Sequence, residues 1–251
     1  MYTAGTAGRT AMQKIELNHE ELDFRSREAF RTLRTNIEFS GDDVKVICLT
    51  SCTPNEGKSD TSFELGKAFA QNGKKVLLID ADLRKSVMRH RHKKGKVRLG
   101  LVNYLVGRAS MDDVLCSTDI RNFAMVFCGP VPPNPSELLG NDRFKNMIAR
   151  AREEYDMVII DTPPLGSVID TAVVSKVCDG VVLVVAAGTI SYRFVRSVKE
   201  QLEVTGCRIL GAVLNKVDMT GKGYYGKYYG RYYGKYYGKY YGKYYGNYGE
   251  E

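Results

Sequence analysis

Short apolar segments recur along the chain, and each is bounded by charged or turn-forming residues. Their apolar positions are nearly continuous rather than alternating, which is typical of strands buried on both faces. Segments with helical spacing separate most of them, so the pattern predicts a mostly parallel sheet flanked by helices. The predicted strands span residues 44–50, 74–82, 123–129, 155–164, 179–188 and 207–218.

Helical spacing appears first near the N-terminus. Leu22, Phe30, Leu33 and Ile37 recur there among charged residues in the segment 19–40, an amphipathic pattern. Similar patterns follow the first strand and lie between later ones. These further predicted helices span residues 58–73, 141–154, 168–178 and 191–205.

The segment 221–251 has neither pattern. It repeats Tyr-Tyr-Gly-basic with a period of four and holds 13 of the 17 tyrosines. Frequent glycine and the lack of long aliphatic side chains predict disorder. We therefore expect a flexible arm (1–18), one folded domain (19–220) and a disordered tail (221–251). The tail tyrosines are Tyr224, Tyr225, Tyr228, Tyr229, Tyr232, Tyr233, Tyr236, Tyr237, Tyr240, Tyr241, Tyr244, Tyr245 and Tyr248.

Charge and cysteine usage narrow the class of protein. The net charge is +8, and the stretch 222–251 supplies half of it, with six basic and two acidic residues (6 − 2 = +4). Six scattered cysteines without a Cys-x-x-Cys pair predict reduced thiols rather than disulfides or zinc. The longest apolar run, 180–188, is too short to span a bilayer, and no secretory signal is evident. We expect a cytoplasmic protein.

The most informative local pattern is "TSCTPNEGKSD" at residues 50–60, between the first strand and the helix 58–73. A loop in this place wraps phosphates with backbone N–H groups at a helix N-terminus. Lys58 would neutralise the β/γ oxygens, and the Ser59 hydroxyl would bind Mg²⁺. The predicted fold is therefore an α/β P-loop NTPase. The residues expected to contact ATP are Thr53, Pro54, Asn55, Glu56, Gly57, Lys58, Ser59 and Asp60.

Two residues of this loop depart from the strict pattern. Cys52 stands where the pattern has its first glycine. Asp60 is the second residue after the lysine, where a carboxylate repels phosphate unless it points away or pairs with a cation. We expect Asp60 to face the adjoining helix surface.

Carboxylates follow two further predicted strands. Asp80 and Asp82 come at the end of 74–82, and Asp161 follows "MVII". The carboxyl ends of parallel strands share one edge of the sheet, which is also the edge of the phosphate-binding loop. Each aspartate alone could merely cap a turn. Together with Lys58 they favour a nucleotide site with Mg²⁺, which prefers oxygen ligands.

These segments together resemble the bacterial tyrosine kinases, the P-loop kinases linked to capsule and exopolysaccharide synthesis. The resemblance covers roughly residues 20–251. "TSCTPNEGKS" is similar to the family's Walker A loop and "MVIIDTPP" to its Walker B. "LLIDADLRKS" is similar to its Walker A prime, with Ser86 where proline is usual. A tyrosine-rich tail follows the domain, as in the family. The resemblance implies an ATP-dependent protein-tyrosine kinase that autophosphorylates this tail in trans and regulates polysaccharide synthesis.

The resemblance also implies roles for single residues. Lys58 and Ser59 would hold ATP and Mg²⁺, Asp82 and Asp161 would organise the metal, and Asp80 would be the base toward the tyrosine hydroxyl. Phosphoryl transfer requires in-line placement, charge neutralisation and a group that accepts or orients the attacking proton. The residue pattern supports this in outline, and the choice of Asp80 over Asp82 comes from the resemblance alone.

The predicted helix 19–40 carries a further match. Glu28, Arg31 and Arg34 fit the family's E-x-x-R-x-x-R motif, and their spacing places them along one helix face. Such a face is either solvated or, by resemblance, a contact in a ring-shaped homo-oligomer, expected to be an octamer. The resemblance also implies a membrane-bound activator that recruits the chain to the inner face of the membrane, and a cognate tyrosine phosphatase.

Alternatives remain for the basic and tyrosine-rich segments. The stretch 83–98, with His90 and His92, is either a solvated loop or a surface for an acidic partner, and no nucleic-acid recognition fold is apparent. The tail could instead bind RNA through stacking and charge, or serve only as a solubilising extension. With an RNA- or partner-binding tail, the domain would be a P-loop ATPase of the DNA-partitioning or division-site type, although those enzymes carry a lysine where this chain has Thr53.

Overall fold

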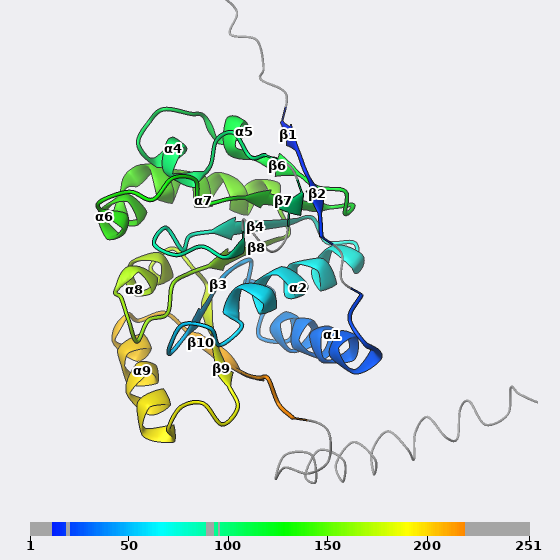
Figure 1. The fold of residues 1–251 in the computed structure, drawn as a ribbon, viewed down its shortest axis with the longest axis vertical. Helices are drawn as coiled ribbons and strands as arrows, with labels where there is room; N and C mark the ends of the chain where they lie inside the picture. Colours follow the sequence, from blue (N-terminus) through cyan, green and yellow to red (C-terminus); the bar gives the residue numbers. More distant parts are fainter. Residues whose placement is uncertain (1–11, 19–20, 89–92, 95, 219–251) are drawn as a thin grey trace, which may run out of the picture.

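The computed structural model describes residues 12–218 except 19–20, 89–92 and 95. Its centre is an eight-stranded sheet in the order β1-β6-β7-β4-β8-β3-β9-β10 (Figure 1). Its strand pairs are parallel except for β6 with β7. The strands are β1 (Gln13–Lys14), β3 (Val46–Ser51), β4 (Val76–Asp80), β6 (Cys116–Ser117), β7 (Phe123–Val126), β8 (Met157–Asp161), β9 (Gly180–Ala186) and β10 (Ile209–Asn215).

Helices cover both faces of this sheet (Figure 1). Helix α1 packs on α2, and α2 packs on β4 and β8, while α4 to α7 lie on the other side of the sheet. A separate antiparallel pair joins β2 (Glu16–Leu17) to β5 (Lys93–Lys94). The helices are α1 (Phe24–Glu38), α2 (Lys58–Gln71), α4 (Leu101–Leu105), α5 (Met111–Val114), α6 (Pro135–Gly140), α7 (Asp142–Glu154), α8 (Asp170–Ser175) and α9 (Tyr192–Val204).

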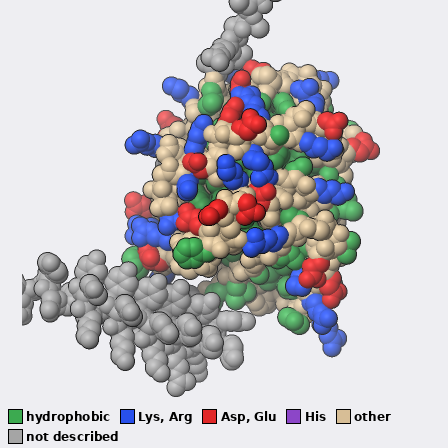
Figure 2. Space-filling model, turned by 180° about the vertical axis from the view of Figure 1, so that it is seen from behind, with side chains coloured by type: hydrophobic (Ala, Val, Ile, Leu, Met, Phe, Trp, Pro, Cys, Tyr) green, Lys and Arg blue, Asp and Glu red, His purple; other side chains and the backbone are tan. Residues whose placement is uncertain are grey.

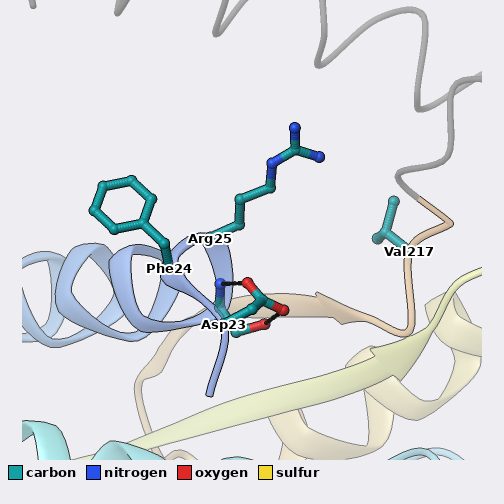
Figure 3. Close-up of a pocket in the computed structure, with 5 residues that line it drawn as sticks. Asp23, Phe24, Arg25 and Val217 are labelled. Carbon is teal, nitrogen blue, oxygen red and sulfur yellow. Dashed lines mark hydrogen bonds between the residues drawn. The ribbon is translucent and has the colours of Figure 1, made fainter. Parts of the chain in front are cut away.

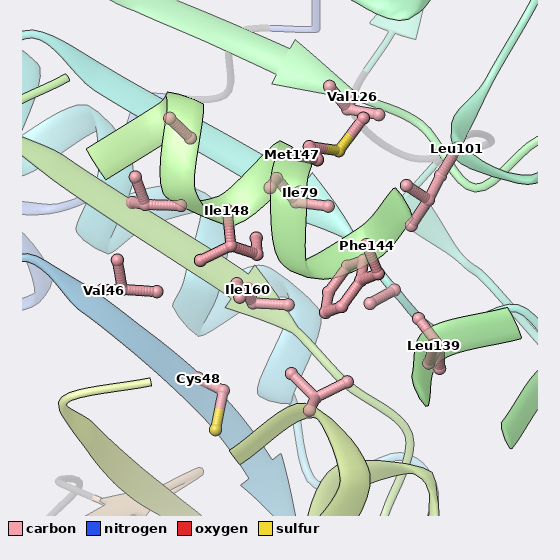
Figure 4. Close-up of a cluster of buried hydrophobic side chains, with 14 of the residues drawn as sticks. Val46, Cys48, Ile79, Leu101, Val126, Leu139, Phe144, Met147, Ile148 and Ile160 are labelled. Atoms are coloured by element: carbon pink, nitrogen blue, oxygen red, sulfur yellow. The ribbon is translucent and has the colours of Figure 1, made fainter. Parts of the chain in front are cut away.

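Successive residues of the central strands enter two different cores. Val46 and Cys48 of β3 face the cluster that includes α7, α8 and α9 (Figure 4). Ile47 and Leu49 face the cluster under α1 and α2. All four side chains are fully buried. Because side chains alternate across a strand, burial on both faces requires the nearly continuous apolar runs seen in the sequence.

The parallel, doubly covered sheet confirms the predicted fold class, and all six predicted strands are present in shortened form. Helix α1 is also shorter than the segment 19–40, because Asp23 caps it and Leu22 lies before it. The two-residue strands and helices α4, α5 and α6 were not predicted. They span two to six residues, too few to show a period.

The structure shows where the charged side chains and the cysteines lie. Basic and acidic side chains are interspersed on the face shown in Figure 2, which is typical of a solvated surface. The six cysteines, all within the described residues, form no disulfide with one another, and four of them are buried. Within the described ranges, the helices are too short or too polar for any of them to cross a bilayer.

Candidate nucleotide and phosphoryl-transfer site

The phosphate-binding loop joins β3 to α2 at the carboxyl edge of the sheet. Helix α2 begins at Lys58, directly after Gly57, whose φ is +85°. A Cβ on Gly57 would lie 2.1 Å from the Asn215 side-chain nitrogen, so only glycine fits there. The first N–H groups of α2 have no acceptor within the helix and point out of its end. They are therefore available to phosphate oxygens.

The end of β10 holds this loop from outside. Asn215 Nδ2 donates to the Glu56 carbonyl at 2.9 Å, and Lys216 Nζ donates to the Asn55 carbonyl at 2.6 Å. Asn55 and Lys216 both have positive φ, +67° and +56°, a conformation that asparagine tolerates but that is costly for lysine. The loop is therefore held in place by contacts with a segment far away in sequence.

Glu56 braces the loop from within. Its side chain is buried and accepts from the backbone N–H of Thr53 at 2.7 Å and of Ala186 at 3.1 Å. The Thr53 amide is thus committed to Glu56, and Pro54 has no N–H to offer. The N–H groups that can meet phosphate are consequently those from Asn55 onward.

The three predicted carboxylates meet at this edge. Asp80 and Asp161 are register partners on β4 and β8. Asp161 accepts from Lys58 Nζ at 2.8 Å, Ser59 Oγ at 2.7 Å and Ser62 Oγ at 3.0 Å. Asp82 Oδ2 lies 4.0 Å from Lys58 Nζ. Lys58 is therefore the cation that balances this cluster.

Asp80 differs from its neighbours in its hydrogen bonds. It is fully buried, and its Oδ2 accepts from Ser86 Oγ at 2.5 Å and from Cys128 N–H at 3.4 Å. Its Oδ1 is buried and has no hydrogen-bond partner among the described residues. Burial, with the negative charge of Asp161, raises the pKa of Asp80 to about 7. A carboxyl that titrates near neutral pH is suited to act as a general base.

The two unusual loop residues have local explanations. Cys52 is fully buried, and burial together with Glu56 raises the pKa of its thiol to about 12. Cys52 is therefore a neutral packing residue. Asp60 lies half-buried in the first turn of α2, where the helix dipole stabilises a carboxylate.

An ion pair between the partly exposed Arg84 and the buried Asp170 secures the segment after β4. Arg84 Nε and Nη2 donate to the Asp170 carboxylate at 2.7 and 3.0 Å, and Ser136 Oγ donates to it at 2.5 Å. Burial opposes the charge of Asp170, but the bonds from Arg84 and Ser136 outweigh it and lower the pKa of Asp170. The segment carrying Asp82 is thereby tied to α6 and α8.

The three residues of the E-x-x-R-x-x-R motif do not share one environment. Arg31 pairs with Glu28 at 2.6 Å, and both side chains are solvent-accessible. Arg34 instead turns onto α2 and donates to the Ala68 carbonyl at 3.3 Å. An open hollow lies beside this helix, between its N-terminal residues 23–26 and Val217 (Figure 3).

Several contacts were not predicted. Ser62, Ser86 and Glu56 all bond within the site. Glu56 was expected to contact ATP and Ser86 was noted at the family's proline position, but their bonds were not predicted. Ser62 was not named, although it follows Lys58 by one helical turn. The tail tyrosines, the N-terminal residues 1–11, His90 and His92 lie outside the described residues.

Comparison with known proteins agrees with this geometry. A family model described as an AAA domain matches residues 44–204. The tyrosine-protein kinase CpsD of Streptococcus agalactiae is 46% identical over 194 residues, which are 77% of this chain and 85% of that protein. The tyrosine-protein kinase YwqD of Bacillus subtilis (strain 168) is 39% identical over 220 residues, which are 86% and 92% of the two chains.

Solved structures of bacterial tyrosine kinases superpose on this chain. The chimerical protein CapA2B2 superposes with a TM-score of 0.74 at 35% identity, over 84% of this chain and 95% of that one. The kinase domain of the Escherichia coli tyrosine kinase ETK has a TM-score of 0.74 at 33% identity, over 84% and 91%. The septum site-determining protein MinD of Pyrococcus horikoshii, complexed with Mg-ADP, shares the fold, with a TM-score of 0.58 at 23% identity over 70% and 72%. The chain therefore belongs to the bacterial tyrosine kinases, the P-loop protein-tyrosine kinases associated with capsule synthesis.

Proposed function

We propose that this kinase transfers the γ-phosphoryl group of ATP to the tyrosines of its own tail, and that it does so between subunits. The observation that carries the proposal is the convergence of Lys58, Asp161 and Asp80 at the end of the phosphate-binding loop. Phosphoryl transfer depends on positioning and charge neutralisation more than on covalent chemistry. A lysine, oxygen ligands for a metal and a carboxyl with a pKa near 7 supply these needs.

The residues present fit Mg²⁺. Ser59 Oγ and Asp161 Oδ2 lie 2.7 Å apart. The Asp82 carboxylate lies near Lys58, with its Oδ2 4.0 Å from Lys58 Nζ. The described residues contain no group of three or more His, Cys, Asp or Glu that could hold a metal alone. This suits Mg²⁺, which is usually held by one or two carboxylates together with water and substrate phosphates. When bound, it would neutralise charge on the phosphate oxygens.

Asp80 is the proposed base. Its Oδ1 has no hydrogen-bond partner among the described residues, and a buried acceptor left unpaired costs free energy. A tyrosine hydroxyl entering the site would donate to this oxygen. The phenolic oxygen would then attack the γ-phosphorus as its proton passes to Asp80, and ADP would leave.

The tail is the proposed substrate. The last described residues stand beside the loop, where Lys216 contacts Asn55. A flexible chain of 30 residues has a root-mean-square span of roughly 30 Å, enough to reach a neighbour's site in a compact ring. Tethering also raises the local concentration of the tyrosines.

The proposed assembly is a ring that uses the solvent-accessible pair Glu28 and Arg31, with Arg34 holding the helix on α2. We further propose that a membrane-bound activator recruits the kinase to the cytoplasmic face of the membrane. A cognate phosphatase would reverse its action, and the cycle would regulate capsular or exopolysaccharide synthesis.

The rival proposal, a partitioning-type ATPase with an RNA-binding tail, predicts RNA retention that depends on the tail and not on ATP.

The test is incubation of the full chain with Mg·ATP, followed by detection of phosphotyrosine. We expect loss of signal in Lys58→Met, Asp80→Asn and a chain truncated after Thr220. Lys67→Met is the matched control, because Lys67 pairs with Glu64 on the same helix away from the carboxylates. Strong signal in Lys58→Met would contradict the site. If the wild-type chain is silent, binding of an ATP analogue that Lys58→Met abolishes and Lys67→Met preserves still tests the nucleotide site.

A further inference from the structure

Ser86 contacts the proposed base from outside the phosphate-binding loop. Its hydroxyl donates to Asp80 Oδ2 at 2.5 Å. The Cys128 N–H approaches the same oxygen at 3.4 Å, while Oδ1 has no hydrogen-bond partner among the described residues. The two oxygens of the Asp80 carboxylate therefore differ in their hydrogen bonds. Oδ2 accepts from two donors, whereas Oδ1 still has the capacity to accept a hydrogen bond.

The segment after β4 delivers Ser86 to this position. Asp82 Oδ1 accepts from the backbone N–H of Lys85 at 3.0 Å, which closes a turn. Arg84 is fixed on the other side by the buried Asp170. These two contacts bring Ser86 back over the end of β4. The serine hydroxyl is therefore presented by a braced segment rather than by a free loop.

The χ2 torsion of an aspartate is broad and roughly two-fold, so a buried carboxylate needs partners to fix its orientation. The Ser86 bond is the shorter of the two bonds to Oδ2 and comes from a rotatable hydroxyl donor. The 3.4 Å contact from Cys128 lies beyond the usual range for a strong N–H···O bond. Ser86 is therefore the main constraint on which oxygen of Asp80 is held by donors and which is left without a partner among the described residues.

We infer that Ser86 is a positioning residue that holds Asp80 Oδ2, so that Oδ1 receives the proton of the tyrosine hydroxyl. The inference rests on the proposed role of Asp80. In the step, a bond forms between the phenolic oxygen and the γ-phosphorus of ATP. The bond from that phosphorus to the oxygen bridging to ADP breaks, the phenolic proton passes to Oδ1, and ADP carries away the electron pair. Ser86 keeps its own proton throughout and makes no contact with ATP.

The test compares Ser86→Ala with Ser86→Thr in the full chain, with Ser197→Ala as control. Ser197 is half-buried and donates to the Phe194 carbonyl of its own helix, α9. We expect Ser86→Ala to lower the rate of phosphotyrosine formation about ten- to a hundredfold, as expected from losing a hydrogen bond to a charged group. The KM for ATP and the affinity for a non-hydrolysable ATP analogue should stay within about twofold. Thr keeps the hydroxyl and should restore most of the rate.

The outcomes separate this inference from the proposed function. Wild-type rate in Ser86→Ala with an inactive Asp80→Asn overturns the positioning role alone, whereas an active Asp80→Asn overturns the base assignment itself. A rise in the KM for ATP without loss of kcat, or a folded Ser86→Thr as slow as Ser86→Ala, also overturns positioning. The crystal structure of Ser86→Ala gives a readout independent of activity. We expect Asp80 to rotate from its wild-type orientation, and an unchanged carboxylate would contradict the inference.

Discussion

Lys58 Nζ lies 2.8 Å from Asp161 Oδ1, although 103 positions separate the two residues in sequence. Both side chains are buried, so the lysine supplies the positive charge that a cluster of aspartates needs away from water. Arrival of phosphates and a metal ion brings charges of both signs to the same place. With both bound, Lys58 would contact phosphate, and Ser59, Asp82 and Asp161 would hold the metal.

The charge of Asp161 should control the titration of Asp80. Burial is the first cause of the raised pKa of Asp80, and repulsion by Asp161 is the second. Asp161→Asn removes that repulsion, so the pKa of Asp80 should fall toward its usual value. Carbon-13 NMR of the labelled carboxyl group, without nucleotide and Mg²⁺, measures this directly. An unchanged or higher pKa would contradict the electrostatic account.

Stability should depend on pH through Asp80. Its pKa is about 7 in the folded chain and 3.8 in the reference state, so the folded state keeps a proton that the unfolded state loses between these values. The contribution of Asp80 to stability therefore declines as pH rises from about 4 to 7. Asp80→Asn lacks this titration. Urea unfolding of both chains at pH 5 and pH 8 should show the wild type losing more stability than the variant.

The pH dependence of the kinase activity should also follow the ionisation of Asp80. A base must be deprotonated before it accepts a proton, so the rate of tail phosphorylation should rise as pH passes through about 7. The measurement is the initial rate of phosphotyrosine formation against pH at Mg·ATP concentrations well below KM, because that rate reports the ionisation of the free enzyme. A rate that stays flat from pH 6 to 8 would indicate that Asp80 does not act in the rate-limiting step.

Gly57→Ala should damage nucleotide binding more than folding. Its Cβ would meet Asn215 Nδ2 at 2.1 Å, and its φ is +85°. The clash and the left-handed strain each cost about 1–2 kcal/mol or more. We expect the loop to shift to relieve them, which moves its N–H groups away from the phosphates and lowers ATP-analogue affinity at least tenfold.

Gly73→Ala is the matched control for this change. Gly73 has nearly the same φ, +86°, but open space around its Cβ. It should lose about 1 kcal/mol of stability and keep its affinity. Adding Asn215→Ala to Gly57→Ala should recover only part of the binding, because the backbone strain remains. Full recovery would assign the whole effect to the clash.

Arg84→Ala should destabilise the chain by about 2–3 kcal/mol. It leaves the buried Asp170 carboxylate with Ser136 as a donor, and breaking a buried ion pair is costly. The exposed side of Arg84 moderates the loss. Arg196→Ala, in an exposed pair with Glu200, should change stability by less than about 0.5 kcal/mol. Denaturant unfolding distinguishes the two, and equal effects would contradict the structural role of the pair.

Phosphorylation of the tail should loosen the assembly. Each phosphate adds about −1.5 to −2 charges, so three modified tyrosines cancel or reverse the +4 of the stretch 222–251. We expect a smaller particle after Mg·ATP treatment than after exhaustive dephosphorylation, measured by light scattering on a sizing column. The same size in both states would rule out this form of regulation.

The sequence alone determined the fold class and the place of the site. Continuous apolar runs require a sheet covered on both faces, and aspartates at the strand ends must then gather at one edge, beside the loop of Lys58. Asp80, Asp161 and Lys58 were therefore predicted together from local pattern, and the register of β4 and β8 places the two carboxylates side by side.

Tertiary structure alone decided how these groups are held. The bonds from Ser86 to Asp80, from Lys216 to Asn55 and from Arg84 to Asp170 link separate segments or turns. None of them follows a helical or strand period that a sequence could display. Local pattern reports which face of an element is buried, whereas the partner of a single polar group depends on how several elements pack. For this reason Asp80 was expected to be the base through the family resemblance, whereas its hydrogen bond from Ser86 was not predicted.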